Sequence, residues 1–232
     1  MIVITGATGQ LGSQIVTQLL QRVPPEQVGA SVRDPARAQG LSARGVRVRH
    51  GDFADPASLA AAFEDASQVL IVSASATGSD VLAQHHCAVD AARAVGAKSI
   101  LYTSHQAAGS DSLFAPMPDH AATEMYLSRS GTPFTALRNG FYANTILRLI
   151  GPALATSEIV APADGPVSWT THADLAEAAA IILADEGRFD GATPPLTARD
   201  AVDLDGIAGM LSELTGRTIR RVVSMTTSSL PA

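Results

Sequence analysis

The start of the chain places three glycines between a short apolar run and an amphipathic segment. Residues 2–4 are continuously apolar, as in a strand that is buried on both faces. Gly6, Gly9 and Gly12 follow, and apolar residues then recur at helical spacing as far as Leu20. A strand, a glycine turn and a helix in this order predict a binding site for the pyrophosphate of a dinucleotide.

Each glycine has a separate physical role in such a turn. Gly6 lets the chain leave the strand sharply, Gly9 leaves room for a pyrophosphate against the backbone, and Gly12 lets the helix pack close to the strand. Free N–H groups and the positive dipole end of the helix add attraction for phosphate. The alternative is a glycine turn without a ligand, which the flanking strand and helix disfavour. The other residues of the turn that we expect to contact the cofactor are Thr8, Gln10 and Leu11.

The composition limits the classes of function open to the chain. Its 232 residues suit one domain with a small appended lobe, and 46% of them are hydrophobic, enough for a large core. The formal net charge of −6 argues against a nucleic-acid partner. A single cysteine, Cys87, allows no internal disulfide and fits a reducing cytoplasm. Because no signal peptide or spanning helix is apparent, we expect a cytoplasmic protein without a membrane partner.

Strand-like and helix-like segments alternate through about residue 138. Such alternation predicts an α/β fold of the Rossmann type, a doubly wound parallel sheet with helices on both faces. Ligands of these sheets bind beyond the carboxyl ends of the strands, so distant residues converge on one crevice. After the first strand and helix, the strands are expected at 27–32, 46–50, 69–72, 99–102 and 133–137, and the helices at 36–41, 56–62, 80–95 and 119–128.

The pattern loosens after Phe141. Residues 151–169 indicate loops with short strands, whereas 172–184 has a strong helical pattern. We therefore assign residues 1–140 to a dinucleotide-binding Rossmann domain and residues 141–232 to a small substrate-binding lobe that does not fold independently. Its other expected elements are helices at 143–150 and 207–214 and a last strand at 218–223.

The end of the second predicted strand indicates which dinucleotide is bound. An Asp or Glu is usual there when the adenosine ribose is free, because a carboxylate accepts from its hydroxyls. The residue here is Arg33, whose guanidinium can grip a 2′-phosphate, so we predict NADP(H). The alternative is a surface arginine paired with Asp34. After the third strand, Asp52 and Phe53 are expected beside the adenine, although Asp52 could equally be a turn residue.

Several short segments together resemble one family. They are Ile-Thr-Gly-Ala-Thr-Gly-Gln-Leu-Gly, Val-Arg-Asp-Pro, Arg-His-Gly-Asp-Phe, Leu-Tyr-Thr-Ser and Leu-Arg-Asn-Gly. They are similar to segments of the NmrA-like branch of the atypical short-chain dehydrogenase/reductases, and within it to NADPH-dependent quinone oxidoreductases and triphenylmethane reductases. The resemblance runs from residue 1 to about 223, and it includes His85 and the Asp-His-x-x-Thr-Glu stretch at 119–124. Such relatives usually continue with further helices around the substrate, so the resemblance implies a more open pocket here or one completed by a second copy in a homodimer.

The sequence lacks the catalytic pair of typical short-chain dehydrogenases. Those enzymes use Tyr-x-x-x-Lys, in which the lysine lowers the pKa of the tyrosine. Lys98 is the only lysine of the chain, and it precedes the fifth predicted strand, at the end of the sheet opposite the crevice. Alcohol oxidation and nucleotide-sugar epimerisation are therefore disfavoured.

Reduction of a quinone or a similar conjugated acceptor makes smaller demands on the protein. The acceptor is already electrophilic, so its orientation against the nicotinamide does most of the work. We expect Ser104 to bond a carbonyl oxygen, or else to cap its strand. His120 is expected to supply a proton, or else to be a surface histidine. Asn139 is expected to orient the acceptor, or else to be a turn residue, and Ser73 to flank the nicotinamide ribose.

Neighbouring His85, His86 and Cys87 do not predict a metal site. Adjacent positions on a helix point to different faces, and we interpret His85 as a core histidine. The sequence thus predicts an NADPH-dependent oxidoreductase that transfers hydride to a small quinone-like acceptor without a metal. The alternative is a non-catalytic NADP(H)-binding protein that senses redox state.

Overall fold

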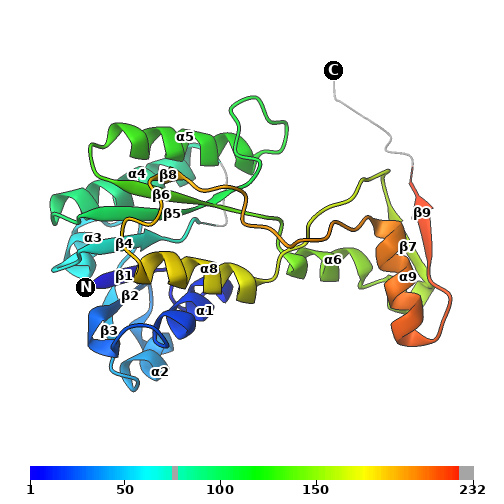
Figure 1. The fold of residues 1–232 in the computed structure, drawn as a ribbon, viewed down its shortest axis with the longest axis horizontal. Helices are drawn as coiled ribbons and strands as arrows, with labels where there is room; N and C mark the ends of the chain where they lie inside the picture. The colour runs from blue at the N-terminus through cyan, green and yellow to red at the C-terminus, as the bar shows by residue number, and fades with distance from the viewer. Residues whose placement is uncertain (75–77, 225–232) are drawn as a thin grey trace. The chain divides into compact units, whose positions relative to one another are not determined.

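A computed structural model describes residues 1–74 and 78–224 of the protein. Within these residues, seven parallel strands form one sheet in the order β3–β2–β1–β4–β5–β6–β8 (Figure 1). The predicted Rossmann-type α/β fold is therefore confirmed. The strands are β1 (Ile2–Thr5), β2 (Val28–Val32), β3 (Arg47–His50), β4 (Gln68–Ile71), β5 (Ser99–His105), β6 (Phe134–Asn139) and β8 (Gly191–Ala192).

Helices cover both faces of this sheet. On one face α1 (Gln10–Leu19) packs against α8 (His172–Ala184), and on the other α4 (Ser79–Ala94) lies between α3 (Pro56–Phe63) and α5 (Pro116–Arg129) (Figure 1). Local signals fix their ends. Asp55, for example, caps α3 by accepting from the N–H groups of Ala57 and Ser58, at 3.0 and 3.3 Å. Such a cap stabilises a helix by about 1 kcal/mol.

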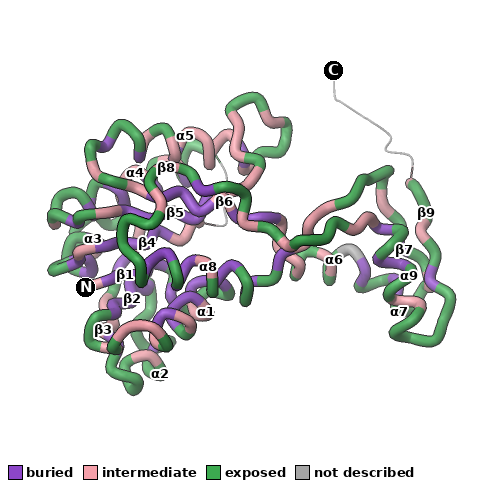
Figure 2. The backbone as a smooth tube through the Cα atoms, in the orientation of Figure 1, coloured by how far each residue is buried: buried purple, intermediate pink, exposed green. Residues whose placement is uncertain are grey.

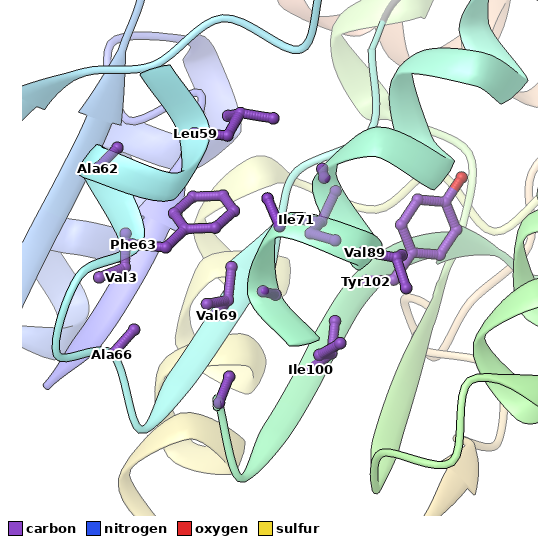
Figure 3. Packing of buried hydrophobic residues seen from close by; sticks show 14 of the residues in the cluster. Val3, Leu59, Ala62, Phe63, Ala66, Val69, Ile71, Val89, Ile100 and Tyr102 are labelled. Carbon is purple, nitrogen blue, oxygen red and sulfur yellow. The ribbon is translucent and has the colours of Figure 1, made fainter. Parts of the chain in front are cut away.

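The core on the α3–α4–α5 face is made of aliphatic residues and two buried aromatic rings. Buried residues follow the strands (Figure 2), and Phe63 and Tyr102 lie among the aliphatic side chains (Figure 3). Tyr102 has no exposed surface, and its hydroxyl points away from Ile100 (Figure 3). Because a buried hydroxyl is costly without a hydrogen bond, this tyrosine needs polar neighbours.

The strand order reverses between β1 and β4. From β1 the chain proceeds outward to β2 and β3, whereas β4 leads to β5 and β6 on the other side. Hydroxyl groups tie the carboxyl ends of these central strands together. The Thr5 hydroxyl accepts from the N–H of Val72 at 2.9 Å, and the Thr103 hydroxyl accepts from the N–H of Ser73 at 2.8 Å. Such a reversal is where sheets of this kind bind their ligands.

The chain divides into two compact units, one of residues 1–139 and 172–196, the other of 140–171 and 197–232. In the second unit, β7 (Glu158–Ala161) pairs in parallel with β9 (Arg220–Val223). Its buried core includes Ile159, Ile207 and Ile219. The helices of this unit are α6 (Ile146–Ile150), α7 (Ala153–Thr156) and α9 (Leu204–Thr215).

This division differs from the predicted one at 140/141. Residues 172–196 belong to the sheet unit, because α8 buries Leu175, Ala176 and Ala179 while packing on α1, and β8 pairs with β6. Short β7 and β8 were not predicted individually. In the described residues, no helix is long and apolar enough to span a membrane.

Three predicted ends also differ from the structure. Both β5 and β6 run further than expected, so Ser104 and Asn139 lie within strands and not beyond them. Since α5 begins at Pro116, His120 lies in its second turn.

Candidate active site

The glycine turn folds tightly against the start of α1. Gly6 has φ +59°, a left-handed conformation that favours glycine, and its carbonyl accepts from the N–H of Gly9 at 2.9 Å. A Cβ on Gly12 would lie 2.3 Å from the carbonyl oxygen of Gly6, so a side chain there would displace the turn. Gly9 is the N-cap of α1 and provides no side-chain cap. The first N–H groups of α1 are therefore open to an anion, as a pyrophosphate site requires.

A cavity of about 370 Å³ lies beside this turn. Two arginines, Arg37 and Arg44, bring positive charge to it, and the hydroxyls of Thr8 and Ser13 also line it. Arg44 was not predicted, because it lies eleven positions beyond the strand end that the fingerprint considers. The positive charge of this lining suits an anionic ligand.

Arg33 follows β2 directly and is exposed. It does not form the alternative ion pair with Asp34 in the described structure. The Asp34 carboxylate instead caps the following 3₁₀ turn (η2, Pro35–Ala38) by accepting from the N–H of Ala36 at 3.0 Å. Arg33 is not among the residues that line the cavity, and its role in binding a 2′-phosphate stays a prediction.

Asp52 and Phe53 follow β3 as expected. One carboxylate oxygen of Asp52 accepts from the N–H of Ala54 at 2.9 Å, which is the turn role that the sequence left open. Phe53 is half-buried and packs against the core. Their contact with an adenine ring stays a prediction.

Four polar side chains form a buried cluster where α4 and α5 meet β5. The hydroxyl of Tyr102 lies 2.8 Å from His120 Nδ1 and 3.4 Å from His85 Nδ1. His85 Nδ1 also lies 3.1 Å from the hydroxyl of Thr123. We name these four residues the Tyr102 cluster. His85 is a core histidine as predicted, with 2% of its surface exposed, whereas His86 stacks on Tyr126.

Burial keeps the histidines around this cluster neutral. Burial, with a smaller contribution from the nearby His120, lowers the pKa of His85 and of His105 to about 4. Burial also lowers the pKa of His120, although the carboxylates of Glu124 and Asp119 act in the opposite direction. A lowered pKa favours the neutral imidazole of His120 at pH 7, which can donate through one N–H, and its role as a proton source stays a prediction.

Ser104 lies in a second polar group on the same face of the sheet. Its hydroxyl donates to Glu124 at 2.6 Å. The same carboxylate accepts from Arg138 Nε at 3.1 Å and from Arg138 Nη2 at 2.7 Å. Ser104 is 3% exposed, so its hydroxyl is held in one direction by an acidic partner.

The remaining candidates lie at two strand ends. Asn139 is 2% exposed, and its side-chain oxygen is buried without a hydrogen-bond partner among the described residues. Such an acceptor is costly unless another group satisfies it. Ser73, at the end of β4, accepts from the Thr103 hydroxyl at 3.1 Å.

The structure brings His120 together with two residues that sequence reasoning missed. Tyr102 is followed four residues later by Gln106 and not by a lysine, and neither Tyr102 nor His105 was predicted as a site residue. The sequence did place Asp119, Thr123 and Glu124 on one predicted helix, but it did not show which strand residues they meet.

Comparisons with known proteins agree with this geometry. Residues 6–186 match the NAD(P)H-binding family. Quinone oxidoreductase 2 of Escherichia coli strain K12 is 37% identical over 94% of this chain and 76% of its own length. An NmrA-like family domain-containing oxidoreductase of Aspergillus flavus is 32% identical over 93% of this chain and 72% of its own length.

A solved structure is similar over nearly the whole fold. Triphenylmethane reductase of Citrobacter sp., complexed with NADP(H), superposes with a TM-score of 0.89 and 34% identity, covering 97% of this chain and 79% of that one. The glycine turn, the sheet order and these matches lead to one assignment: the chain belongs to the NAD(P)H-binding NmrA-like family.

Proposed function

We propose that the protein is an NADPH-dependent oxidoreductase that transfers a hydride to a quinone or a similar conjugated acceptor. The observation that carries the proposal is the bare-backbone turn of Gly6, Gly9 and Gly12, with an open helix start ahead of α1. Similarity to quinone oxidoreductase 2 and to triphenylmethane reductase supports the choice of acceptor. It also favours an enzyme over the non-catalytic redox sensor.

Different residues would bind the diphosphate and the 2′-phosphate of the cofactor. The glycine turn would hold the diphosphate through backbone N–H groups, assisted by Thr8, Gln10 and Leu11. Arg33, Arg37 and Arg44 would meet the 2′-phosphate, which distinguishes NADPH from NADH. When bound, the cofactor supplies a hydride equivalent.

The protein's own groups then orient the acceptor and handle charge on its oxygen. Reducing a quinone to a hydroquinone takes one hydride and one proton. The neutral N–H of His120 is the donor we assign to the acceptor's oxygen, and Asn139 is assigned to the orientation of the acceptor. Ser104 donates its one hydrogen to Glu124, so it would bond the acceptor's carbonyl oxygen only after its hydroxyl turns away from that carboxylate. Ser73 would flank the nicotinamide ribose, with Asp52 and Phe53 at the adenine.

Other parts of the proposal concern the setting of the enzyme. A net charge of −6 disfavours nucleic-acid partners. We further propose a cytoplasmic location and a homodimer. Light scattering on a sizing column distinguishes the monomer mass of 23.9 kDa from twice that value.

The test is the loss of NADPH absorbance with a panel of quinones under anaerobic conditions. We expect consumption that depends on the quinone, with equal amounts of NADPH lost and hydroquinone formed. NADH at the same concentration should react more slowly. No consumption across the panel, with NADPH binding intact, would reject the reductase and leave the redox sensor.

A further inference from the structure

The hydrogen bonds of the Tyr102 cluster have directions that can be assigned. The starting point is the backbone N–H of Ala74, which lies 3.2 Å from His85 Nε2. A backbone N–H is always a donor, so His85 Nε2 must accept. An imidazole with one accepting nitrogen and no charge carries its hydrogen on the other, here Nδ1.

The partner of His85 Nδ1 agrees with this assignment. The hydroxyl of Thr123 lies 3.1 Å away, and it donates its own hydrogen to the carbonyl oxygen of Asp119 at 2.8 Å. Thr123 therefore accepts from His85 Nδ1. Burial, which lowers the pKa of His85 to about 4, keeps the ring in this neutral form at pH 7.

The assignment passes from His85 to Tyr102. Because His85 Nδ1 already carries hydrogen, it cannot accept from the phenol at 3.4 Å. His120 Nδ1 lies closer, at 2.8 Å, and a phenol hydroxyl is a good donor to a neutral imidazole nitrogen. Tyr102 thus donates to His120 Nδ1, which leaves the hydrogen of His120 on Nε2.

Two further observations make His120 Nε2 the outward-facing end of the cluster. Within residues 1–74 and 78–224, His120 Nε2 forms no hydrogen bond. The fully buried side-chain nitrogens and oxygens that lack a partner do not include this atom. Tyr102 itself has no exposed surface, so it cannot touch a substrate and must act through its neighbour.

We propose that Tyr102 is a positioning residue that fixes His120 as the Nε2–H tautomer, so that this N–H points a preset hydrogen bond at the oxygen of the acceptor. The inference rests on the proposed reductase function. A donor set in place before reaction stabilises negative charge on that oxygen without reorganising. The hydride comes from the cofactor and the proton of the hydroquinone from water, so Tyr102 keeps its proton throughout.

The first experiment reads the tautomer directly. Two-bond ¹H–¹⁵N correlation spectra of ¹⁵N-histidine-labelled protein distinguish Nδ1–H from Nε2–H imidazoles, and His120→Gln identifies the His120 signals. We expect one tautomer in the unmodified protein, with hydrogen on Nε2. Tyr102→Phe should give a mixture of the two His120 tautomers. Tyr126→Phe is the control, because it removes a phenol hydroxyl on α5 that donates to Asp90 of α4, and it should leave the His120 tautomer unchanged.

A different spectrum would overturn the inference. His120 protonated on Nδ1 in the unmodified protein, or a spectrum unchanged by Tyr102→Phe, would show that the phenol does not set the tautomer. This measurement needs no turnover. If the protein reduced no quinone but showed the expected tautomer, the proposed function would fail and the assignment of the Tyr102 cluster would stand.

The second experiment is a double-mutant cycle on quinone reduction. Losing one hydrogen bond corresponds to about a tenfold effect, so Tyr102→Phe should lower kcat about tenfold with the KM for NADPH unchanged. In a His120→Gln protein the amide nitrogen replaces Nε2 and needs no help from the phenol. Adding Tyr102→Phe there should have no further effect on kcat. Equal losses in both backgrounds would instead mean a general structural role and would reject the proposal.

Discussion

The carboxylate of Glu124 holds the guanidinium of Arg138 through two hydrogen bonds, of 3.1 and 2.7 Å, and accepts a third from Ser104. Its side chain is only 12% exposed, whereas that of Arg138 is 34% exposed. A half-buried carboxylate with three donors is costly to replace, because the donors lose their partner.

Glu124→Gln is therefore expected to lower the free energy of unfolding by about 1–3 kcal/mol, as measured by urea denaturation. Glu177→Gln is the matched control, since Glu177 is 57% exposed in its ion pair with Arg22. It should change the free energy by less than about 0.5 kcal/mol. Equal effects of both substitutions would contradict a special role for Glu124.

Gly12→Ala should weaken NADPH binding at least about tenfold, a difference of about 1.4 kcal/mol in binding free energy. The added Cβ would lie 2.3 Å from the Gly6 carbonyl oxygen and push the turn away from α1. Titration calorimetry measures this change. Gly209→Ala on α9 is the control, because its Cβ meets nothing within 4 Å. An unchanged dissociation constant for Gly12→Ala would mean that the turn does not hold the diphosphate.

Arg33→Ala and Arg44→Ala separate the two places where a 2′-phosphate could be held. A charged hydrogen bond contributes about 1.5–3 kcal/mol, so the arginine in contact should weaken NADPH binding by about tenfold or more and leave NADH binding unchanged. Arg93→Ala serves as the control, since Arg93 pairs with Asp90 on the surface of α4. If NADPH and NADH binding fell equally, neither arginine would read the phosphate.

His85 makes stability depend on pH in a defined direction. Its pKa is lowered from 6.5 to about 4 by burial, so the unfolded chain takes up a proton at a pH where the folded one does not. The stability associated with the neutral ring is therefore complete above about pH 6.5, and it is lost progressively as the pH falls toward 4. At the lower limit the loss is on the order of 3 kcal/mol.

The measurement compares unfolding by urea at pH 7.5 and pH 4.5 for the unmodified protein and for His85→Gln. Carboxylates contribute to both proteins, so the difference between the two pH dependences isolates the histidine. We expect the variant to lose less stability than the unmodified protein on acidification. Parallel losses would show that His85 is not held neutral in the fold.

The sequence predicted those features that depend on neighbouring residues. The glycine turn ahead of α1 and the start of α3 at Pro56 are set within a few positions, and both are found. The buried hydrogen bond between Tyr102 and His120 joins residues on β5 and α5, and no local sequence pattern predicts it. Arg44 was not predicted as a binding residue for a similar reason, because only the fold brings it to the cavity beside the glycine turn.

The placement of α8 and β8 could not be predicted from their order in the chain. The helical pattern of α8 is clear and the pattern of β8 is weak, but neither shows that the chain returns to the first unit after residue 171. The apolar residues of α8 fit α1 as well as they would fit a separate lobe, and only the tertiary contact decides between them.

This return has a consequence for biosynthesis. The apolar stripe of α1, including Ile15 and Leu19, is covered by α8, which begins at His172. A nascent chain still attached to the ribosome therefore carries its dinucleotide turn on a helix whose apolar side stays uncovered until α8 has been synthesised. Apolar surface that is exposed during that interval is prone to aggregation, which chaperones counter.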